Sequence, residues 1–514
     1  MGERVQIRKD EKGIQTLLVD GKPYLLLGGE LHNSSASSLS YMEEEVWPYI
    51  RELGLNTILL PITWEGIEPK EDKFDFQILE GLLEQARREG VKLILLWFGL
   101  WKNGESTYVP VWVKKDTKRF FRAAYSEGEP SQTISPLCQA AVNADAKAFS
   151  HFMAKLKELD QSEHTVLMVQ VENEIGFLGA DRDYSSFANQ SYEILIPERV
   201  TEEYKKEGSW GQAFGEDAPE MFMAYHYAEA VEIIARAGKE VYDLPLYVNA
   251  WLNQFPDRPG NYPSGGPITR NMQMWKCVAG HIDVFAPDIY LSDFAGVCEE
   301  YVQMENPLLI PEARRDPVTA SNAFYAFGQH FALGFSPFGI EDFLKPSVEV
   351  PDERLLSELN IDAAAFTCIQ TGNYLKETYR VLKELEPLYY ECRGTSRLMA
   401  FMKKSEHERG CILPLATCDL ELTYCPKGIQ KPGCAGIVIE KEDGEFWIAG
   451  CNVEIRLIPK KGRADCITLA VLEEGGFVDG EWKAGRVLNG DERALSKLGA
   501  YAEIKHFIYC TSDH

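Results

Sequence analysis

The stretch VLMVQVENEIGFLG, residues 166–179, places two glutamates around an asparagine at the end of an apolar run. The run VLMVQV favours a buried strand, because all but one of its residues are apolar and no turn-forming residue interrupts it. Glu172 and Glu174 follow at the point where such a strand would reach solvent. Acids in that position are typical of the active-site face of a barrel of parallel strands, where the carboxyl ends of the strands meet.

Similar apolar runs recur along the first two thirds of the chain. The eight runs are PYLLLGG (23–29), NTILLPI (56–62), VKLILLWFG (91–99), TVLMVQVE (165–172), LPLYVNA (244–250), IDVFAP (282–287), NPLLIPE (306–312) and ALGFSPFG (332–339). Segments between them, such as residues 40–54 and 76–90, repeat apolar residues at intervals of three and four and end at a glycine, as helices do. Eight strand–helix repeats predict an α/β fold, a (β/α)8 TIM barrel with insertions. No glycine-rich phosphate fingerprint follows the first run, which argues against a dinucleotide-binding sheet.

The pattern changes after a helix predicted over residues 374–391. Residues 436–459 and 477–490 favour short strands, joined by turns at Asp-Gly and Asn-Gly pairs. We therefore predict a TIM-barrel catalytic domain over residues 1–391, which begins with a hairpin, and a small antiparallel β-sandwich-like domain over residues 392–514.

The composition excludes several classes of partner. The formal net charge of -26 at pH 7 disfavours nucleic acid and anionic membranes, which bind clustered lysine and arginine. The amino terminus shows no signal-peptide pattern, and no apolar run is long enough to cross a membrane, so we expect a cytoplasmic protein. The 12 cysteines lack C-x-x-C pairs and zinc-type spacing, which predicts free thiols, no metal and no cofactor.

A second acid follows the seventh apolar run, where PLLIPEARRD carries Glu312. In a barrel, Glu174 and Glu312 would face one another from strands four and seven. Two such carboxylates are what glycosidic bond cleavage needs: one protonates the leaving oxygen and the other attacks the anomeric carbon or activates water. Each acid by itself could equally be a helix cap or an ion-pair partner. By strand alternation Glu172 falls on the same side as Glu174 and would tune or orient it.

Three stretches together resemble the clan A retaining glycoside hydrolases, and most closely glycoside hydrolase family 35, the β-galactosidases. They are GGELHNSS (28–35), LGLNTILLPITWEGIEPKEDKFDF (53–76) and QVENEIG (170–176). The resemblance implies that Glu174 is the general acid/base and Glu312 the nucleophile. It also implies that Asn173 holds the sugar 2-hydroxyl.

Further sugar-binding positions are predicted with the same resemblance in view. Asn103 and Glu105 resemble the family's Asn-x-Glu pair after strand three, Glu30 lies in the Gly-Glu-x-His segment, and Tyr290 resembles the tyrosine near the nucleophile. Aromatic residues at strand ends could stack on sugar rings, although core packing is an equally good interpretation for each. They are Trp64, Trp97, Trp101, Trp251 and Phe338.

Two departures from the family pattern bear on the substrate. Pro61 stands where many members carry a tyrosine three residues before the strand-two tryptophan, and residues 331–343 lack the Gly-Gly-Thr-Asn-Phe-Gly run of secreted members. The chain more resembles a short bacterial branch with a C-terminal β domain. Some members of that branch act on plant-wall oligosaccharides, and some transfer glucosyl units.

We expect a retaining exo-β-glycosidase, most simply a β-galactosidase that releases terminal β-D-galactose by double displacement. Its partner would be an oligosaccharide or glycoside, with no nucleic acid and no membrane, and a homo-oligomer is a further option. Two alternatives stay open: a β-glucosidase or transglycosylase acting on β-gluco-oligosaccharides, and a sugar-binding barrel without activity. The presence of both carboxylates speaks against the inactive barrel.

Overall fold

Eight parallel strands close into a barrel in the computed structural model, which describes residues 5–253, 257–345, 362–425, 432–460 and 466–512. In barrel order they are β4 (Leu26–Glu30), β5 (Thr57–Thr63), β6 (Lys92–Lys102), β9 (Val166–Asn173), β10 (Leu246–Trp251), β11 (Val284–Ile289), β12 (Leu309–Ala313) and β13 (Gly334–Pro337). Each strand falls on one of the apolar runs, so the predicted TIM barrel is confirmed. The strands are buried almost throughout, because helices cover the barrel from outside.

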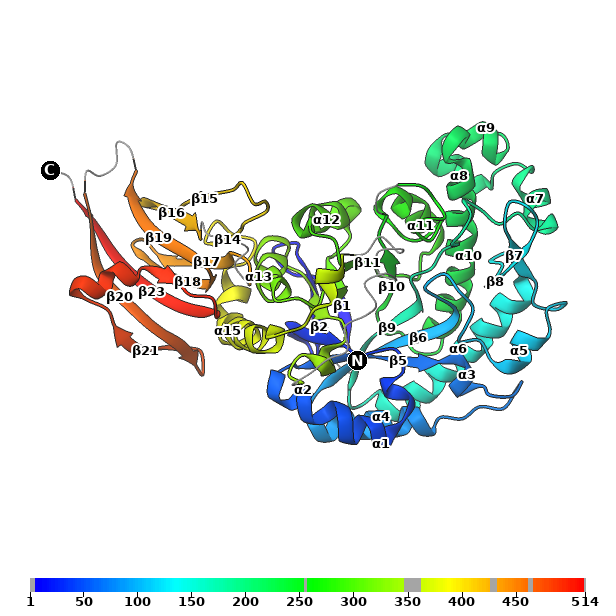
Figure 1. The fold of residues 1–514 in the computed structure, drawn as a ribbon, viewed down its shortest axis with the longest axis horizontal. Helices are drawn as coiled ribbons and strands as arrows, with labels where there is room; N and C mark the ends of the chain where they lie inside the picture. Colours follow the sequence, from blue (N-terminus) through cyan, green and yellow to red (C-terminus); the bar gives the residue numbers. More distant parts are fainter. Residues whose placement is uncertain (1–4, 254–256, 346–361, 426–431, 461–465, 513–514) are drawn as a thin grey trace.

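Helices and a few short elements connect the barrel strands (Figure 1). The helices are α1 (Leu39–Tyr41), which runs through a π-turn (Met42–Val46) into α2 (Trp47–Leu53), then α3 (Trp64–Ile67), α4 (Gln77–Glu89), α5 (Val111–Lys115), α6 (Gln139–Asp160), α7 (Ser186–Tyr192), α8 (Glu198–Tyr204), α9 (Trp210–Phe214), α10 (Ala218–Lys239), α11 (Met272–Val278), α12 (Phe294–Tyr301), α13 (Val318–His330) and α15 (Thr371–Cys392). Gly54 and Gly90 end α2 and α4 in the left-handed conformation, at φ 71° each, as predicted for C-caps.

Two small antiparallel sheets accompany the barrel. Strands β1 (Gln6–Lys9), β2 (Gln15–Val19) and β3 (Lys22–Pro23) form a three-stranded sheet before β4, which extends the predicted hairpin by one strand. Strands β7 (Arg122–Ala124) and β8 (Pro130–Ile134) pair in the connection that follows β6. This connection leaves the carboxyl end of β6, at the barrel face where active sites of this fold lie.

The part of the chain after α15 forms two antiparallel sheets, as predicted. A six-stranded sheet has the order β14 (Leu398–Met402), β17 (Ala435–Glu442), β18 (Glu445–Cys451), β23 (Glu503–Ser512), β20 (Cys466–Val478) and β21 (Glu481–Val487). A four-stranded sheet has the order β15 (Gly410–Pro414), β16 (Cys418–Tyr424), β19 (Val453–Pro459) and β22 (Lys497–Leu498).

The tight turns of this region follow the sequence with one exception. Asp443-Gly444 joins β17 to β18 and Asp479-Gly480 joins β20 to β21, as expected. Asn489-Gly490 does not close a hairpin, because it opens a 3-10 helix over Gly490–Leu495 in which the Asn489 side chain accepts from the Gly490 amide at 2.8 Å. An Asn side chain can cap a helical turn as readily as it can shape a hairpin.

The six-stranded sheet has two apolar faces because its side chains alternate. Ile437 and Ala449 belong to the core that is continuous with the barrel, whereas Val438 and Ile448 belong to the core between the two sheets. The first face packs on α13 and α15, which lie between the barrel and the sheets in Figure 1. The β-sheet region is therefore attached to the barrel through a buried apolar interface.

All 12 cysteines are free thiols, as predicted. Among the helices that the structure describes, none has an apolar stretch of the length needed to cross a bilayer.

Candidate active site

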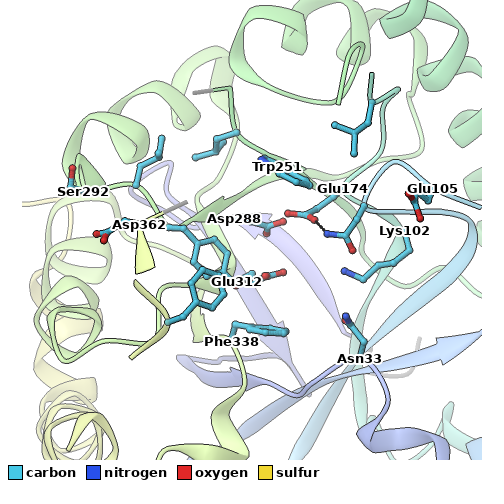
Figure 2. A pocket seen from close by; sticks show the side chains of 16 residues that line it. Asn33, Lys102, Glu105, Glu174, Trp251, Asp288, Ser292, Glu312, Phe338 and Asp362 are labelled. Carbon is cyan, nitrogen blue, oxygen red and sulfur yellow. Dashed lines mark hydrogen bonds between the residues drawn. The ribbon is translucent and has the colours of Figure 1, made fainter. Parts of the chain in front are cut away.

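A cavity of about 540 Å³ opens at the carboxyl ends of the barrel strands. Its size is typical of small-molecule sites. Most of the predicted site residues line it, and Figure 2 shows several of them pointing toward its centre. The lining residues are Asn33, Lys102, Asn103, Glu105, Glu174, Leu178, Trp251, Leu252, Asp288, Tyr290, Leu291, Ser292, Glu312, Phe338, Asp362 and Phe366.

Glu174 follows directly after β9, and its carboxyl group lies in this cavity. Its backbone is left-handed, at φ 45°, a conformation that costs a residue other than glycine about 1–2 kcal/mol. Two asparagines hold the residue: its backbone N–H donates to Asn249 Oδ1 at 3.0 Å, and the Asn103 side-chain amide donates to its carboxylate. These contacts fix the direction in which the Glu174 carboxyl points.

Glu312 lies in β12, across the barrel from Glu174, and is 7% exposed. The Tyr290 hydroxyl donates to one of its oxygens, and the other oxygen has no hydrogen-bond partner among the described residues. Tyr290 is in turn stacked on Phe366, with ring centroids 4.9 Å apart. One carboxylate oxygen of Glu312 is thus held by its neighbours and the other faces the cavity.

A third acid, Asp288, was not predicted. It lies in β11, and Asn249 Nδ2 donates to its carboxylate at 2.7 Å, so that Asn249 bridges Asp288 and the Glu174 backbone. One carboxyl oxygen from each of Glu174, Asp288 and Glu312 lies within 4.8 Å of the other two. Asp288 ends the apolar run IDVFAP, so its place after a buried strand was the signal that could have found it.

Burial and mutual repulsion raise the pKa values of these acids. Burial, followed by the charge of Glu312, raises the pKa of Glu174 to about 7. Burial also raises the pKa of Glu312, while Lys102 and the Tyr290 hydrogen bond act in the opposite direction. The pKa of Asp288 lies well above its usual range because the group is buried beside Glu312 and Glu174. Glu174, with a pKa of about 7, can therefore both donate and accept a proton near neutral pH.

Lys102 is a second residue that sequence reasoning missed. It is the last residue of β6 and is 8% exposed, and it begins the turn Lys102-Asn103-Gly104-Glu105. Asn103 and Gly104 are both left-handed, at φ 51° and φ 69°, as an Asn-Gly turn favours. The polar pair Lys-Asn at the end of an apolar strand was the available signal. The three acids could share a divalent cation by distance alone, but the Lys102 ammonium in the same cavity opposes a second positive charge.

The other predicted sugar contacts lie at different depths. Trp251 and Phe338 line the cavity, and Glu105 lies at its exposed rim. Asn173 and Glu30 lie deeper, at 0% and 1% exposure. Both side-chain polar atoms of Asn173 and one oxygen of Glu30 are buried without a hydrogen-bond partner among the described residues. Such atoms are rare in protein interiors and are typical of ligand sites.

The structure corrects the interpretation of three tryptophans. Trp64 is 0% exposed, donates to Glu68 at 2.9 Å and packs edge-on against Trp112, so it lies in the core and not at the cavity. Trp97 and Trp101 are also fully buried. A tryptophan at a strand end can either stack on a sugar or pack in the core. These three pack in the core, because helices and loops cover them.

Glu172 is likewise not beside Glu174. Its φ of 64° breaks the strand alternation, and its carboxylate accepts from the backbone of Leu100 and Trp101 at 3.1 and 2.6 Å. It also shares a hydrogen bond with Asp145 of α6. The expectation that Glu172 orients Glu174 directly is therefore wrong. Both residues have a left-handed backbone, and their side chains lie on opposite sides of the barrel wall.

Comparison with known proteins identifies two regions of the chain. Residues 16–246 match the family described as Glycosyl hydrolases family 35, and residues 375–497 match a domain of unknown function, DUF5597. A β-galactosidase of Xanthomonas manihotis is 27% identical over 173 residues, which is 32% of this chain and 26% of that protein. β-Galactosidase-1-like protein 3 of Homo sapiens is 24% identical over 186 residues, 35% of this chain and 26% of that protein.

The matched region spans 26% of the length of both curated relatives. Among solved structures, a cold-adapted β-galactosidase of Rahnella sp. R3 aligns with a TM-score of 0.47 and 13% identity, over 70% of this chain and 56% of that one. The family match ends before β12, so it includes Glu174 but not Glu312. The resemblance drawn from the sequence is confirmed for the first part of the chain: residues 16–246 are similar to the glycosyl hydrolases of family 35, and a further domain matches at residues 375–497.

Proposed function

We propose that the protein is a retaining exo-β-glycosidase. The observation that carries the proposal is the approach of the Glu174 and Glu312 oxygens to within 4.8 Å in a buried cavity. Retaining enzymes hold their two carboxyls about 5–5.5 Å apart, whereas inverting enzymes leave about 6.5–9.5 Å for a water molecule. The short separation therefore favours direct attack by one carboxylate on the sugar.

In the first step, a Glu312 carboxylate oxygen attacks the anomeric carbon while Glu174 donates its proton to the leaving oxygen. A pKa of about 7 keeps much of Glu174 protonated at neutral pH, and Lys102 and Tyr290 favour the ionised form of Glu312. The glycosidic bond breaks, a covalent ester to Glu312 forms, and the aglycone leaves with the proton.

In the second step, Glu174 acts as a base. Glycosylation removes the negative charge of Glu312, and with it one of the causes that raise the pKa of Glu174. Ionised Glu174 then takes a proton from water, whose oxygen attacks the anomeric carbon and releases Glu312. Two inversions give net retention, and the asparagine bonds to Glu174 hold its carboxyl in place for both steps.

We propose terminal β-D-galactose as the group released, with β-glucose as the close alternative. Asn103, Glu105 and Asn173 are the residues that support galactose, by the family resemblance. Pro61 lacks the hydroxyl that a tyrosine would bring there, and a site without one such contact discriminates less between epimers.

Glycosyl transfer is the second candidate function, because a smaller cavity has a lining residue in common with the first. It measures about 260 Å³, contains Pro61, and shares Asn33 with the main cavity. Its lining mixes apolar residues such as Ile62 and Ile67 with Thr63 and Gln77, a combination that suits the two faces of a sugar ring. An acceptor sugar bound there would compete with water in the second step.

The test is a panel of nitrophenyl β-glycosides, assayed with and without disaccharide acceptors. A clear preference for the β-galactoside and a first-formed product with β-configuration in NMR would support the main proposal. Dominant transfer products would favour the second candidate. A first product of the opposite anomer would exclude retention, and a folded protein without turnover of any glycoside would leave only a sugar-binding barrel.

We also propose that the boundary between the barrel and the β-sheet domain lies near residue 392. Helix α15 ends at Cys392 and β14 begins at Leu398. Limited proteolysis should cut first between these residues if the boundary is correct. The two fragments should stay associated, because α13 and α15 pack on the apolar face of the six-stranded sheet.

A further inference from the structure

The Lys102 side chain is a buried cation directed into the cavity. It is 8% exposed and lines the cavity together with Glu174 and Glu312 (Figure 2). Its ammonium lies 5.2 Å from the Phe98 ring centroid. Its backbone pairs with Glu105, but no hydrogen bond or ion pair of its Nζ atom occurs among the described residues. An ammonium group carries three donors, and the described residues leave those of Lys102 free for a ligand in the cavity.

The carboxyl groups near Lys102 do not use its hydrogen-bond donors. Lys102 acts electrostatically on Glu30, Glu174 and Glu312, but it forms no ion pair with any of them among the described residues. Its backbone is fixed because Lys102 pairs with Asn173 between β6 and β9 and begins the Asn-Gly turn. The ammonium is therefore held in the cavity with hydrogen bonds still to donate.

The charges around Lys102 determine which kind of ligand group can accept a hydrogen bond from it. The proposed reaction needs Glu312 ionised in the same cavity as Lys102, so a ligand carboxylate or phosphate at Lys102 would be repelled by the Glu312 carboxylate. A neutral hydroxyl oxygen meets no such repulsion. A hydroxyl can also donate, and Glu30 Oε2 and Asn173 Oδ1 are buried acceptors without a partner among the described residues. Lys102 and these acceptors complement the two-way hydrogen bonding of a sugar.

We propose that Lys102 is a substrate-binding residue that donates a hydrogen bond to one hydroxyl of the terminal sugar and so determines which monosaccharide the cavity accepts. The inference deepens the proposed function and rests on it for the identity of the ligand as a sugar. It adds a contact that neither the two catalytic carboxyls nor the predicted asparagines supply.

The experiment combines two variants of Lys102 and one control variant with sugars that lack single hydroxyls. Lys102→Met keeps the apolar stem and removes the donors, Lys102→Gln keeps a donor without the charge, and Lys92→Met changes a lysine at the other end of β6. Each protein is assayed for kcat/KM on the nitrophenyl β-glycoside that the wild type cleaves best and on its monodeoxy analogues. Calorimetry gives the Kd of the free monosaccharides independently of turnover, and thermal unfolding confirms that each variant is folded.

For the wild type, removal of one particular hydroxyl should reduce kcat/KM by about tenfold to hundredfold, as loss of a charged hydrogen bond does. In Lys102→Met the same removal should cost less than about twofold, because the partner is already lost. Lys102→Gln should retain part of the discrimination, and Lys92→Met should behave as the wild type.

The inference would be overturned if the losses of kcat/KM from Lys102→Met and from removal of each sugar hydroxyl were additive at every hydroxyl. A preference of the wild type for a β-glucuronide that Lys102→Met abolishes would also overturn it. If no glycoside is turned over but the Kd of one monosaccharide still depends on Lys102 and on a single hydroxyl, the proposed function fails and the contact stands. If a glycoside is turned over but the losses are additive, the proposed function stands and the Lys102 contact fails.

Discussion

Two groups of buried carboxyls lie on opposite sides of the end of β9, and they differ in what their oxygens contact. The wall pair, Asp145 and Glu172, is 0% exposed, and its oxygens accept from Trp97, Leu100 and Trp101 at 2.6 to 3.1 Å. The cavity cluster, Glu174, Asp288 and Glu312, leaves an oxygen of Asp288 and one of Glu312 without a partner among the described residues. Burial raises the pKa values in both groups.

The comparison teaches that a raised pKa by itself does not identify a catalytic acid. The pKa values of the wall pair are raised because the two carboxyls are buried next to one another and must share a proton. The hydrogen bonds of the pair connect the end of β6 to β9 and α6. In the cavity cluster, the same raised pKa is combined with access to a ligand. Satisfied oxygens indicate a structural role and unsatisfied oxygens beside a cavity indicate a chemical one.

The largest expected effect is that of Glu312→Ala, which removes the attacking carboxylate. Activity should fall by about 10⁵ to 10⁶-fold on every substrate, as for other covalent nucleophiles. Azide should restore turnover and give a glycosyl azide of the opposite anomer, which NMR identifies. A rescued product with the original configuration would show that Glu312 is not the nucleophile.

Next in size is Glu174→Ala, which should separate substrates by their leaving groups. Loss of a general acid costs about 10² to 10⁴-fold where the leaving group needs protonation, so disaccharides should suffer fully. Dinitrophenyl glycosides should keep a nearly normal first step, which a burst of phenolate would reveal. Equal losses on both types of substrate would contradict the role of Glu174.

A smaller effect is expected from pH on the wild-type enzyme. Glu174 has a folded pKa of about 7 and must be protonated to act as an acid, so its ionisation should limit kcat/KM on disaccharides on the alkaline side of pH 7. Above it the value should fall about tenfold per pH unit as the acid loses its proton. Glu174→Gln, assayed on an activated aryl glycoside, should lack this limb. A limb that persists in the variant would assign it to another group.

The smallest effect on catalysis is expected from Glu172→Gln, which changes the wall pair only. The folded pKa of Glu172 lies above its unfolded value, so its contribution to stability is complete below about pH 4 and is lost as the pH rises toward the folded value. The variant should be less stable by about 1–3 kcal/mol at pH 5, because a buried hydrogen-bonded group is replaced. Denaturant unfolding at several pH values measures this.

The difference in stability between wild type and Glu172→Gln should shrink as the pH rises, and kcat should change by less than about threefold. Glu174→Gln is the matched control, with the opposite pattern: a large loss of kcat and little change in stability. If Glu172→Gln abolished activity while its stability was unchanged, the distinction between wall pair and cavity cluster would fail.

The sequence by itself determined the barrel and its two acids. The eight apolar runs became β4, β5, β6, β9, β10, β11, β12 and β13, because a buried parallel strand must be apolar on both faces whatever its neighbours are. Glu174 and Glu312 could be identified because a polar group directly after such a strand emerges at the face where all eight carboxyl ends meet. Both signals are local.

Only the tertiary structure decided which polar residues share the cavity. Lys102 and Asp288 were missed, and Trp64 was placed wrongly, because the direction of a side chain at a strand end depends on closure of the barrel and on the turn that follows. Glu172 and Glu174 show the reason most directly. Two residues apart in an extended strand they would lie on one side, but left-handed backbone at φ 64° and φ 45° sends them to opposite sides of the wall. Such a backbone conformation is stabilised by long-range hydrogen bonds to Leu100, Trp101 and Asn249, which no local pattern in the sequence encodes.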